Sequence, residues 1–324
     1  MLIINGLALP LGAACDAMLG DPRGWPHPVR AIGGLIARSE RTLRAAVGWL
    51  GDGAGLERSA GAILMLWVVS ITGFTVWVVV AACDVLGTPG ALCVRTVLVY
   101  WGLAARSLIV EASMASDAPN LATARRELSQ IVGRDTADLD WPEIHRACVE
   151  TIGENTNDGT VAPIFWYAIA GPVGLWLFKA VSTLDSMVGY RDERYLHLGW
   201  ASARLDDLLN LLPARLTWLL FALAALPGLG RARGALAFGW RDGRKHPSPN
   251  SAWGEAALAG ALGVELGGPS TYRGVERSKP RIGETLRSID ASVVHAATRL
   301  STAVMMLTVG LGTGGLLLVG SSIR

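Results

Sequence analysis

Long apolar runs alternate with polar stretches along the whole chain, and this alternation is its strongest structural signal. A helix that crosses a hydrocarbon layer about 30 Å thick needs roughly 20 apolar residues. Residues 59–83 meet this requirement without a single charged side chain. The same pattern, with one or two charges tolerated, predicts membrane helices at residues 2–18, 59–83, 91–110, 161–181, 208–229 and 305–319.

Arginines between these runs predict how the chain is oriented. Loop 20–58 is rich in arginine, whereas loop 84–90 has no basic residue. The positive-inside rule therefore places loop 20–58 in the cytoplasm and loop 84–90 outside, and loop 111–159 returns to the cytoplasm. Loop 182–207 should then lie outside, yet it also carries arginines. Pro163 or the Gly171-Pro172 pair can break a helix, so we expect the last two helices before residue 230 to dip into the bundle without crossing fully.

Composition agrees with a membrane protein. Apolar residues make up 51% of the chain and charged residues 17%, against about 25% in soluble domains. A net charge of +2 gives no electrostatic case for a nucleic acid partner. We therefore predict an all-α, polytopic helical bundle in the cell inner membrane. Residues 1–324 form a single domain, with a polar cytosolic lobe at 230–300 before the last span.

Polar clusters beside the apolar runs are candidates for chemistry. Three prolines in residues 22–28 fix a rigid turn that presents Arg23 and His27, either as a plain connector or as an anion site. In the run 154–159, Asn and Asp are good N-caps. On a helical turn, however, Glu154, Asn157 and Asp158 would share a face and could hold Mg²⁺, with Asn155 beside them.

The segment 204–215 places charges inside a predicted membrane helix, where they are costly and usually functional. Asp206 and Asn210 are four residues apart, and Arg204 lies three before Asp207. Acids of this kind can hold Mg²⁺, and Arg204 and Arg215 can bind phosphate. An internal ion pair that only joins helices is the alternative.

Two further clusters complete the set. Asp185 and Arg191 flank Gly189, and a surface salt bridge would also explain them. In the loop 245–251, His246 titrates near neutral pH and Lys245 could receive a phosphate, with Asn250 and, further on, Tyr272 nearby. The chain has neither a P-loop nor a dinucleotide-binding glycine motif, so any nucleotide must bind without them.

Taken together, five segments in the same order resemble the CobD/CbiB family: DAMLGDPRGWPHPVRAIG (16–33), ETIGENTNDGTVAP (150–163), STLDSMVGYR (182–191), RLDDLLNLLPARL (204–216) and HPSPNSAWGEAALAGAL (246–262). This resemblance covers almost the whole chain. It implies a membrane adenosylcobinamide-phosphate synthase of cobalamin biosynthesis. Such an enzyme joins (R)-1-amino-2-propanol or its O-phosphate to the ring D propionate of adenosylcobyric acid, with ATP and Mg²⁺. A second copy of the chain or a pathway complex is an expected partner, besides the bilayer.

The resemblance assigns no catalytic residue, so the roles come from the chemistry of amide formation. His246, Asp185 and Glu154 are the candidate catalytic residues. His246 or Asp185 could take the proton that the attacking amine must lose, and Glu154 could help to hold Mg²⁺. Asp158, Asp206 and Asp207 are the candidate metal ligands. The candidate groups for binding substrate and phosphate are Arg23, His27, Asn155, Arg191, Arg204, Asn210, Arg215, Lys245, Asn250 and Tyr272.

Two other functions fit parts of the pattern. A membrane prenyltransferase also binds Mg²⁺ and diphosphate on acidic helices. It would need an Asp-x-x-x-Asp repeat, whereas Asn210 and Ala162 stand four residues after Asp206 and Asp158. A transporter or a scaffold of the corrinoid pathway would also carry broken helices and charges within the membrane. No inverted repeat is visible in the sequence, which favours the ligase.

Overall fold

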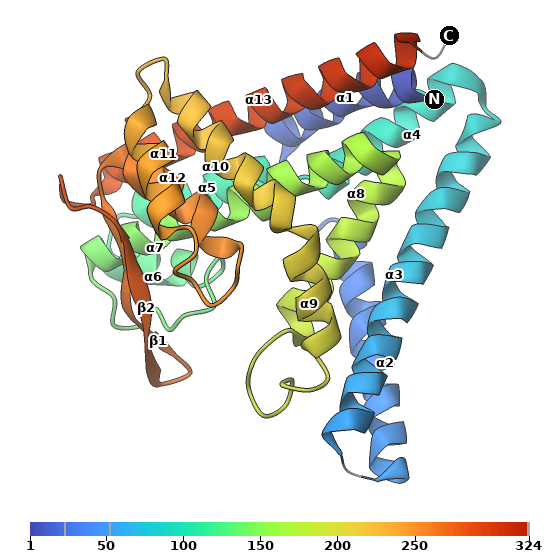
Figure 1. The fold of residues 1–324 in the computed structure, drawn as a ribbon, viewed down its shortest axis with the longest axis horizontal. Coiled ribbons are helices and arrows are strands. Elements are labelled where there is room, and N and C mark those ends of the chain that lie inside the picture. Colours follow the sequence, from blue (N-terminus) through green and yellow to red (C-terminus); the bar gives the residue numbers. More distant parts are fainter. Residues whose placement is uncertain (23, 52, 323–324) are drawn as a thin grey trace.

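The chain is almost entirely helical in a computed structural model that describes residues 1–22, 24–51 and 53–322 (Figure 1). The elements in chain order are α1 (Leu2–Leu19), α2 (Pro28–Leu50), α3 (Ala54–Asp84), α4 (Gly87–Gly102), α5 (Ala105–Ser116), α6 (Leu121–Leu128), α7 (Trp141–Thr156), the π-helical turn η1 (Asn157–Val161), α8 (Ala162–Val188), α9 (Trp200–Leu209), α10 (Leu211–Ala225), α11 (Ala232–Asp242), α12 (Ser251–Leu262), β1 (Glu265–Tyr272), β2 (Val275–Gly283) and α13 (Ala291–Ser322). The predicted helical membrane bundle is confirmed. The sequence pattern did not predict the antiparallel hairpin β1–β2.

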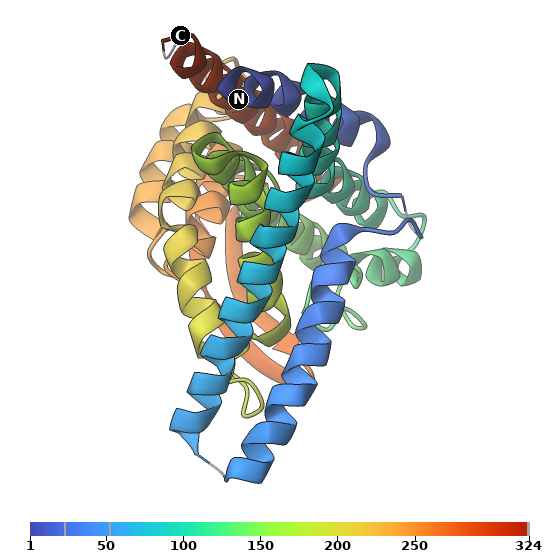
Figure 2. The same ribbon diagram turned by 90° about the vertical axis from the view of Figure 1, so that its right-hand side faces the viewer.

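The apolar runs coincide with the long helices. In the described part of the chain, five helical segments are long and apolar enough to cross a membrane, or six if the bent pair α9–α10 counts as one span. Each predicted run lies within one of these segments, apart from the last few residues of run 208–229. The prediction missed α2, because arginines interrupt its apolar stripe. Ile32 and Ile36 of that stripe are buried, and α2 packs along α3 as a long helical hairpin (Figure 2).

Three breaks in the long helices open space for polar groups. The backbone is extended at Leu103, between α4 and α5, and the buried Asp16 carboxylate accepts a hydrogen bond from the first turn of α5 (Arg106 N to Oδ2, 3.2 Å). Non-helical angles at Ala170 and Gly171 kink α8 just before Pro172, as predicted, whereas Pro163 lies in the first turn of α8 and breaks nothing. Helices α9 and α10 meet at 44°.

Residues 230–300 fold onto the bundle through α12. Every residue of α12 from Ala252 to Leu262 is buried, and the helix packs against α7, α10 and α11 in one shared core. The strand β1 bonds to both members of a buried ion pair between Arg134 and Glu150: Gly267 N donates to Glu150 Oε1 (2.8 Å) and Arg134 Nη1 donates to Ser270 Oγ (3.3 Å). The segment predicted as a polar lobe thus contributes an apolar helix and a polar hairpin.

Candidate functional site

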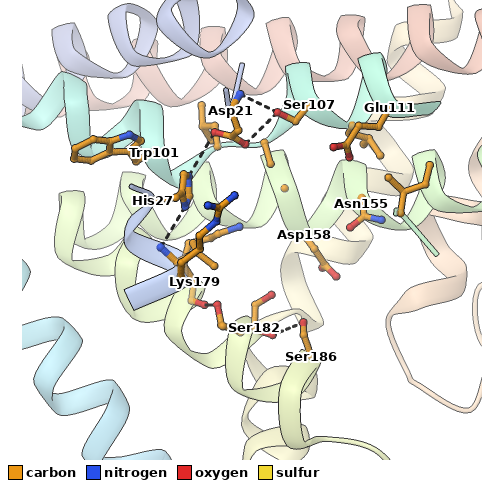
Figure 3. A pocket seen from close by; sticks show the side chains of 18 of the residues that line it. Asp21, His27, Trp101, Ser107, Glu111, Asn155, Asp158, Lys179, Ser182 and Ser186 are labelled. Carbon is orange, nitrogen blue, oxygen red and sulfur yellow. Dashed lines mark hydrogen bonds and ion pairs between the residues drawn. The ribbon is translucent and has the colours of Figure 1, made fainter. Parts of the chain in front are cut away.

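A cavity of about 580 Å³ opens where the α1–α2 connection meets α4, α5, α7, η1 and α8. This is the size of an ordinary small-molecule site. Its wall is partly apolar and partly polar (Figure 3), and the polar side chains that line it are Asp21, His27, Arg30, Ser107, Glu111, Gln130, Thr151, Asn155, Asp158, Lys179, Ser182, Thr183 and Ser186. Tyr100, Trp25 and Trp101 add aromatic surface. Such a cavity suits a ligand with both charged and apolar parts.

One wall of the cavity is a hydrogen-bonded group at the start of α2. His27 Nε2 lies 3.4 Å from Asp21 Oδ1, and the Ser107 hydroxyl donates to Asp21 Oδ2 (3.1 Å). Burial by itself would raise the pKa of Asp21, but hydrogen bonds from His27 and Ser107 hold that pKa below its usual value. Asp21 is therefore an ionised carboxylate at neutral pH, and it keeps the His27 ring in place.

The opposite wall is the second half of α8, where Lys179 points into the cavity beside Ser182 and Ser186 (Figure 3). Sequence reasoning missed Lys179 as a site residue, because a lysine near the end of an apolar run resembles one that reaches for the membrane surface. The available signal was its rarity, since the chain has only three lysines. Thr183 Oγ1 donates to the Lys179 carbonyl oxygen (2.6 Å), so a hydroxyl lies one turn further along the same wall.

The floor of the cavity is the π-helical turn η1, a distortion that is frequent at functional sites. Asn157 Nδ2 donates both to Asp158 Oδ1 (2.7 Å) and to Asn210 Oδ1 (2.8 Å). Asn210 Nδ2 in turn donates to Asp206 Oδ2 (3.1 Å), as their spacing of four residues predicted. These four side chains form a continuous polar chain from the cavity to α9, which we call the acid–amide chain.

A second set of contacts brings the loop before α12 to the same place. Ser248 Oγ donates to Asp207 Oδ1 (3.3 Å), and Asn250 Nδ2 donates to the Asp207 carbonyl oxygen (2.7 Å). Arg215 Nη1 donates to Asn250 Oδ1 (2.6 Å), and its guanidinium lies over the ring of Trp253. Segments 204–215 and 248–253, far apart in sequence, thus share one polar surface.

His246 lines a second, small cavity together with Glu255 and Lys279. Its Nδ1 accepts a hydrogen bond from Ser248 N (3.1 Å). Burial and the charge of Lys279 lower the pKa of His246, so its ring is neutral near pH 7. Glu154, on α7, interacts electrostatically with both His246 and Glu255.

The remaining predicted residues lie around these groups. Asn155 lines the main cavity, and Asp185 on α8 lies within electrostatic range of Asp207 and Glu154. Arg204 Nη1 is 3.9 Å from Asp207 Oδ2 on an exposed surface. Three are peripheral: Lys245 is paired with Asp242 (2.7 Å), Arg191 is exposed after α8, and Tyr272 ends β1. Arg23 lies outside the described residues.

Helices α7 and α12 carry much of this site and touch where each has a glycine. A Cβ atom on Gly153 would come within 2.8 Å of the Glu255 Cα atom, and one on Gly254 within 2.4 Å of the Gly153 carbonyl oxygen. We expect Gly153→Ala to force the helices apart and to lower the free energy of unfolding by about 1–3 kcal/mol, as overpacking does. Thermal unfolding in detergent measures this effect.

The control for this variant is Gly48→Ala. Gly48 lies in the interior of α2, and a Cβ atom there would have no neighbour within 4 Å. The added helix propensity should leave stability unchanged or raise it by up to about 1 kcal/mol. Equal effects of the two substitutions would show that the contact between α7 and α12 is looser than the structure has it.

Comparison with known proteins connects this arrangement to one family. The family model described as CobD/Cbib protein matches residues 9–301. The chain is 49% identical over 315 residues to "Cobalamin biosynthesis protein CobD" of Pelobacter propionicus, covering 95% of each chain. It is 43% identical over 311 residues to "Cobalamin biosynthesis protein CbiB" of Salmonella typhi, covering 94% of this chain and 95% of the relative. No solved structure matches the chain significantly. By the extent of the family match and the identity to these relatives, the chain is a member of the CobD/CbiB family of cobalamin biosynthesis proteins.

Proposed function

We propose that this protein forms the amide bond between the ring D propionate of adenosylcobyric acid and (R)-1-amino-2-propanol or its O-phosphate, with ATP as the energy source. Membership of the CobD/CbiB family supports the pathway. The observation that carries the reaction is the polar cavity that continues into the acid–amide chain inside an otherwise apolar bundle. Amide formation between charged reactants needs such a site.

The chemistry sets three requirements for this cavity. The propionate oxygen attacks the terminal phosphorus of ATP, which gives an acyl phosphate and ADP. The amine nitrogen, after losing a proton, attacks the acyl carbon, and phosphate leaves with the C–O bond electrons. The site must therefore offset phosphate charge, position two ligands and accept one proton.

Residues of the main cavity can meet the first two requirements. Lys179 supplies a positive charge within the cavity, and the hydroxyls of Ser182 and Thr183 supply hydrogen bonds on the same wall. The corrin macrocycle is too large for a cavity of about 580 Å³, so in this proposal only its ring D side chain enters. Trp25 and Trp101 would contact the apolar part of the corrin.

Magnesium is expected with ATP, and the carboxylates near the cavity could supply two of its ligands. Among the residues that the structure describes, no three or more His, Cys, Asp or Glu side chains converge as a metal site. Mg²⁺ usually takes only one or two protein carboxylates and completes its shell with water and phosphate oxygens. Asp158 and Asp206, which lie within electrostatic range of each other and are linked by two amides, would be those carboxylates. Bound there, Mg²⁺ would orient the ATP phosphates and offset their charge.

Much of the cavity wall fits a cytoplasmic substrate such as ATP. Residues 21–30 and 111–159, which line it, belong to the two loops that the arginine pattern assigns to the cytoplasm, and residues 100–108 and 179–186 complete the wall. We therefore propose that this multi-pass protein lies in the bacterial inner membrane with the cavity open to the cytoplasm.

The proposal can be tested in a cobalamin-dependent strain whose own gene for this family is deleted. The wild-type chain should restore growth when cobyric acid is the corrinoid supplied. The double variant Asp206→Asn, Asp207→Asn should restore growth only with cobinamide, which already carries the aminopropanol arm. Both substitutions keep the side-chain shape and remove the charge.

The matched control is Asp138→Asn, which changes an exposed aspartate in the loop before α7. It should support growth on either corrinoid. If the double variant instead loses growth on cobinamide as well, while extracts still convert cobyric acid, the protein acts in corrinoid uptake and the ligase proposal is wrong.

A further inference from the structure

One carboxylate oxygen near the site has no hydrogen-bond partner among the described residues. Glu255 lies on α12 with 3% of its surface exposed. Its Oε1 atom is buried and makes no hydrogen bond within the described part of the chain. An ionised or neutral carboxyl group in this state is costly, since desolvation of a polar group is normally offset by a hydrogen bond. The structure keeps it nevertheless, which points to a ligand.

Glu255 lines the small cavity that His246 and Lys279 also line, with Gly267, Pro280 and Ile282 completing the wall. The volume of this cavity is about 10 Å³, roughly the room that a single water molecule needs. An ammonium group, –NH₃⁺, has the same size. The cavity is thus too small for a phosphate, a sugar or a corrin, and it has room for a protonated amine head.

The charges around this cavity favour a cation. Glu255 and Lys279 line it, and Glu154 acts electrostatically on both of them. Two carboxylates are therefore set against the single positive charge of Lys279. The nearby Glu150 is already neutralised by its ion pair with Arg134. His246 adds no charge near pH 7, because its pKa is lowered. When Glu255 is ionised, as a base must be, one negative charge is left without compensation, and a bound ammonium group would supply the missing positive charge.

The small cavity is also close to the acid–amide chain. Glu154 precedes Asp158 by four residues on α7 and η1, a spacing that places successive side chains on one side of a helix. The two carboxylates interact electrostatically, and Asp158 lines the main cavity. A molecule with a short carbon chain could therefore place its nitrogen beside Glu154 while its other end lies in the main cavity.

We propose that this pocket, lined by His246, Glu255 and Lys279 and called the ammonium pocket below, receives the amine of the aminopropanol substrate and that Glu255 accepts its proton. The inference rests on the proposed ligase function and deepens it. The proton moves from the –NH₃⁺ group to the Glu255 carboxylate. The neutral amine then moves out into the main cavity, where its nitrogen lone pair attacks the activated propionate. The departing phosphate takes the second nitrogen proton, and the proton on Glu255 is returned to solvent.

The environment of Glu255 suits such a base. Burial, reinforced by the charge of Glu154, raises the pKa of Glu255 well above the usual range of a glutamate, against the opposing effect of Lys279. A base whose pKa is closer to that of the amine accepts the proton more readily. The charged groups that act on Glu255 are Glu150 and Glu154 from α7, Lys279 from β2 and Arg134 from the segment before α7.

The variant Glu255→Gln tests this inference in purified, full-length protein. We expect the KM for (R)-1-amino-2-propanol O-phosphate to rise at least 10-fold, with the KM for adenosylcobyric acid unchanged. The acid limb of the pH–rate profile should disappear, because that limb reports protonation of the Glu255 carboxylate. The conservative variant Glu255→Asp should retain part of the activity and the acid limb.

Stability and a control variant separate function from folding. A raised pKa in the folded state means that ionised Glu255 destabilises the fold above the ordinary pKa of glutamate. The neutral Gln should thus leave the melting temperature at pH 7 equal or higher. Glu265→Gln, which changes a partly exposed carboxylate on β1 that pairs with Arg281, should leave both KM values and the pH profile unchanged.

Titration of the amine alone into the protein distinguishes the two failures. If the wild type forms no amide but binds the amine and Glu255→Gln does not, the ammonium pocket stands and the ligase proposal fails. If the wild type forms amide and Glu255→Gln keeps its amine affinity, KM and pH profile, the pocket proposal is overturned. A lower rate of Glu255→Gln with an unchanged KM and an unchanged acid limb overturns the pocket proposal as well, since this result would show that Glu255 has only a structural role.

Discussion

Arg134→Met should be the most destabilising single substitution considered, with a loss of about 3–5 kcal/mol in the free energy of unfolding. The substitution removes the buried charge partner of the Glu150 carboxylate, which is 3% exposed, and leaves it only the more distant Arg146 (Nε to Oε1, 3.9 Å). It also removes the hydrogen bond from Arg134 to Ser270 on β1 (3.3 Å). We expect the hairpin β1–β2 to detach first, because Ser270 and Gly267 of β1 hydrogen-bond to the two members of this ion pair. Chemical denaturation in detergent and limited proteolysis of the hairpin measure the two effects.

Two variants control this experiment. Arg126→Met breaks a surface pair with Glu127, in which the arginine is 69% exposed, and should cost less than about 1 kcal/mol. Arg134→Met combined with Glu150→Leu removes both buried charges and should recover most of the lost stability. If Arg134→Met is as stable as the surface control, the ion pair does not hold the hairpin.

Asp158→Asn should have the largest effect on the reaction, a fall in the rate of amide formation of about 10²–10³-fold. The amide keeps the shape of the side chain, and its oxygen can still accept the hydrogen bond from Asn157. The negative charge at the junction of the main cavity and the acid–amide chain is lost. Steady-state kinetics in purified protein, with a melting curve for each variant, make the measurement.

The control again is the exposed Asp138→Asn, for which wild-type rates are expected. A rate for Asp158→Asn within a factor of two of the wild type would contradict the placement of the reaction in this cavity. Loss of activity together with a lower melting temperature would instead assign Asp158 to folding.

The sequence predicts the architecture well wherever one residue type dominates a long window. Membrane helices need long apolar runs, so residues 59–83 and 305–319 are found inside α3 and α13 without ambiguity. The Gly171-Pro172 break also follows from local chemistry, since proline removes a helix hydrogen bond. Helix α2 was missed because arginines interrupt its apolar stripe, so its mean polarity hides the periodicity.

Contacts within one helical turn could also be predicted from the sequence. The bond from Asn210 to Asp206 follows from a spacing of four residues. The π-helical turn at residues 157–161 could not be predicted, and it turns Asn157 toward Asn210 on another helix. An interpretation of the run 154–159 as a helix cap is wrong for this reason, because α7 continues through η1 into α8.

Contacts between residues that are far apart in the chain could not be predicted from a single sequence. Ser107 binds Asp21 across 86 residues, and Glu150 binds Arg134 next to a hairpin that follows more than a hundred residues later. Lys279 reaches the neighbourhood of Glu255 only because β2 folds back over α12. Tertiary packing creates these pairs, so neither spacing nor composition reveals them.

The clusters that were predicted to gather do so in part. The residues around positions 21 and 158 line one cavity, and Asn157 and Asn210 connect that cavity with Asp206. His246 lies in the adjoining ammonium pocket, with Glu154 between the two. Whether the predicted catalytic, binding and metal roles of these residues are right stays a prediction that kinetics must decide.

The most direct test is amide synthesis by the purified protein in lipid nanodiscs. The reaction would contain adenosylcobyric acid, ATP, Mg²⁺ and either (R)-1-amino-2-propanol or its O-phosphate, and mass spectrometry would follow the corrinoid. We predict a product whose mass equals the two substrates less one water, formed with one ATP consumed per amide. Folded protein that yields no such product with either amine would contradict the account.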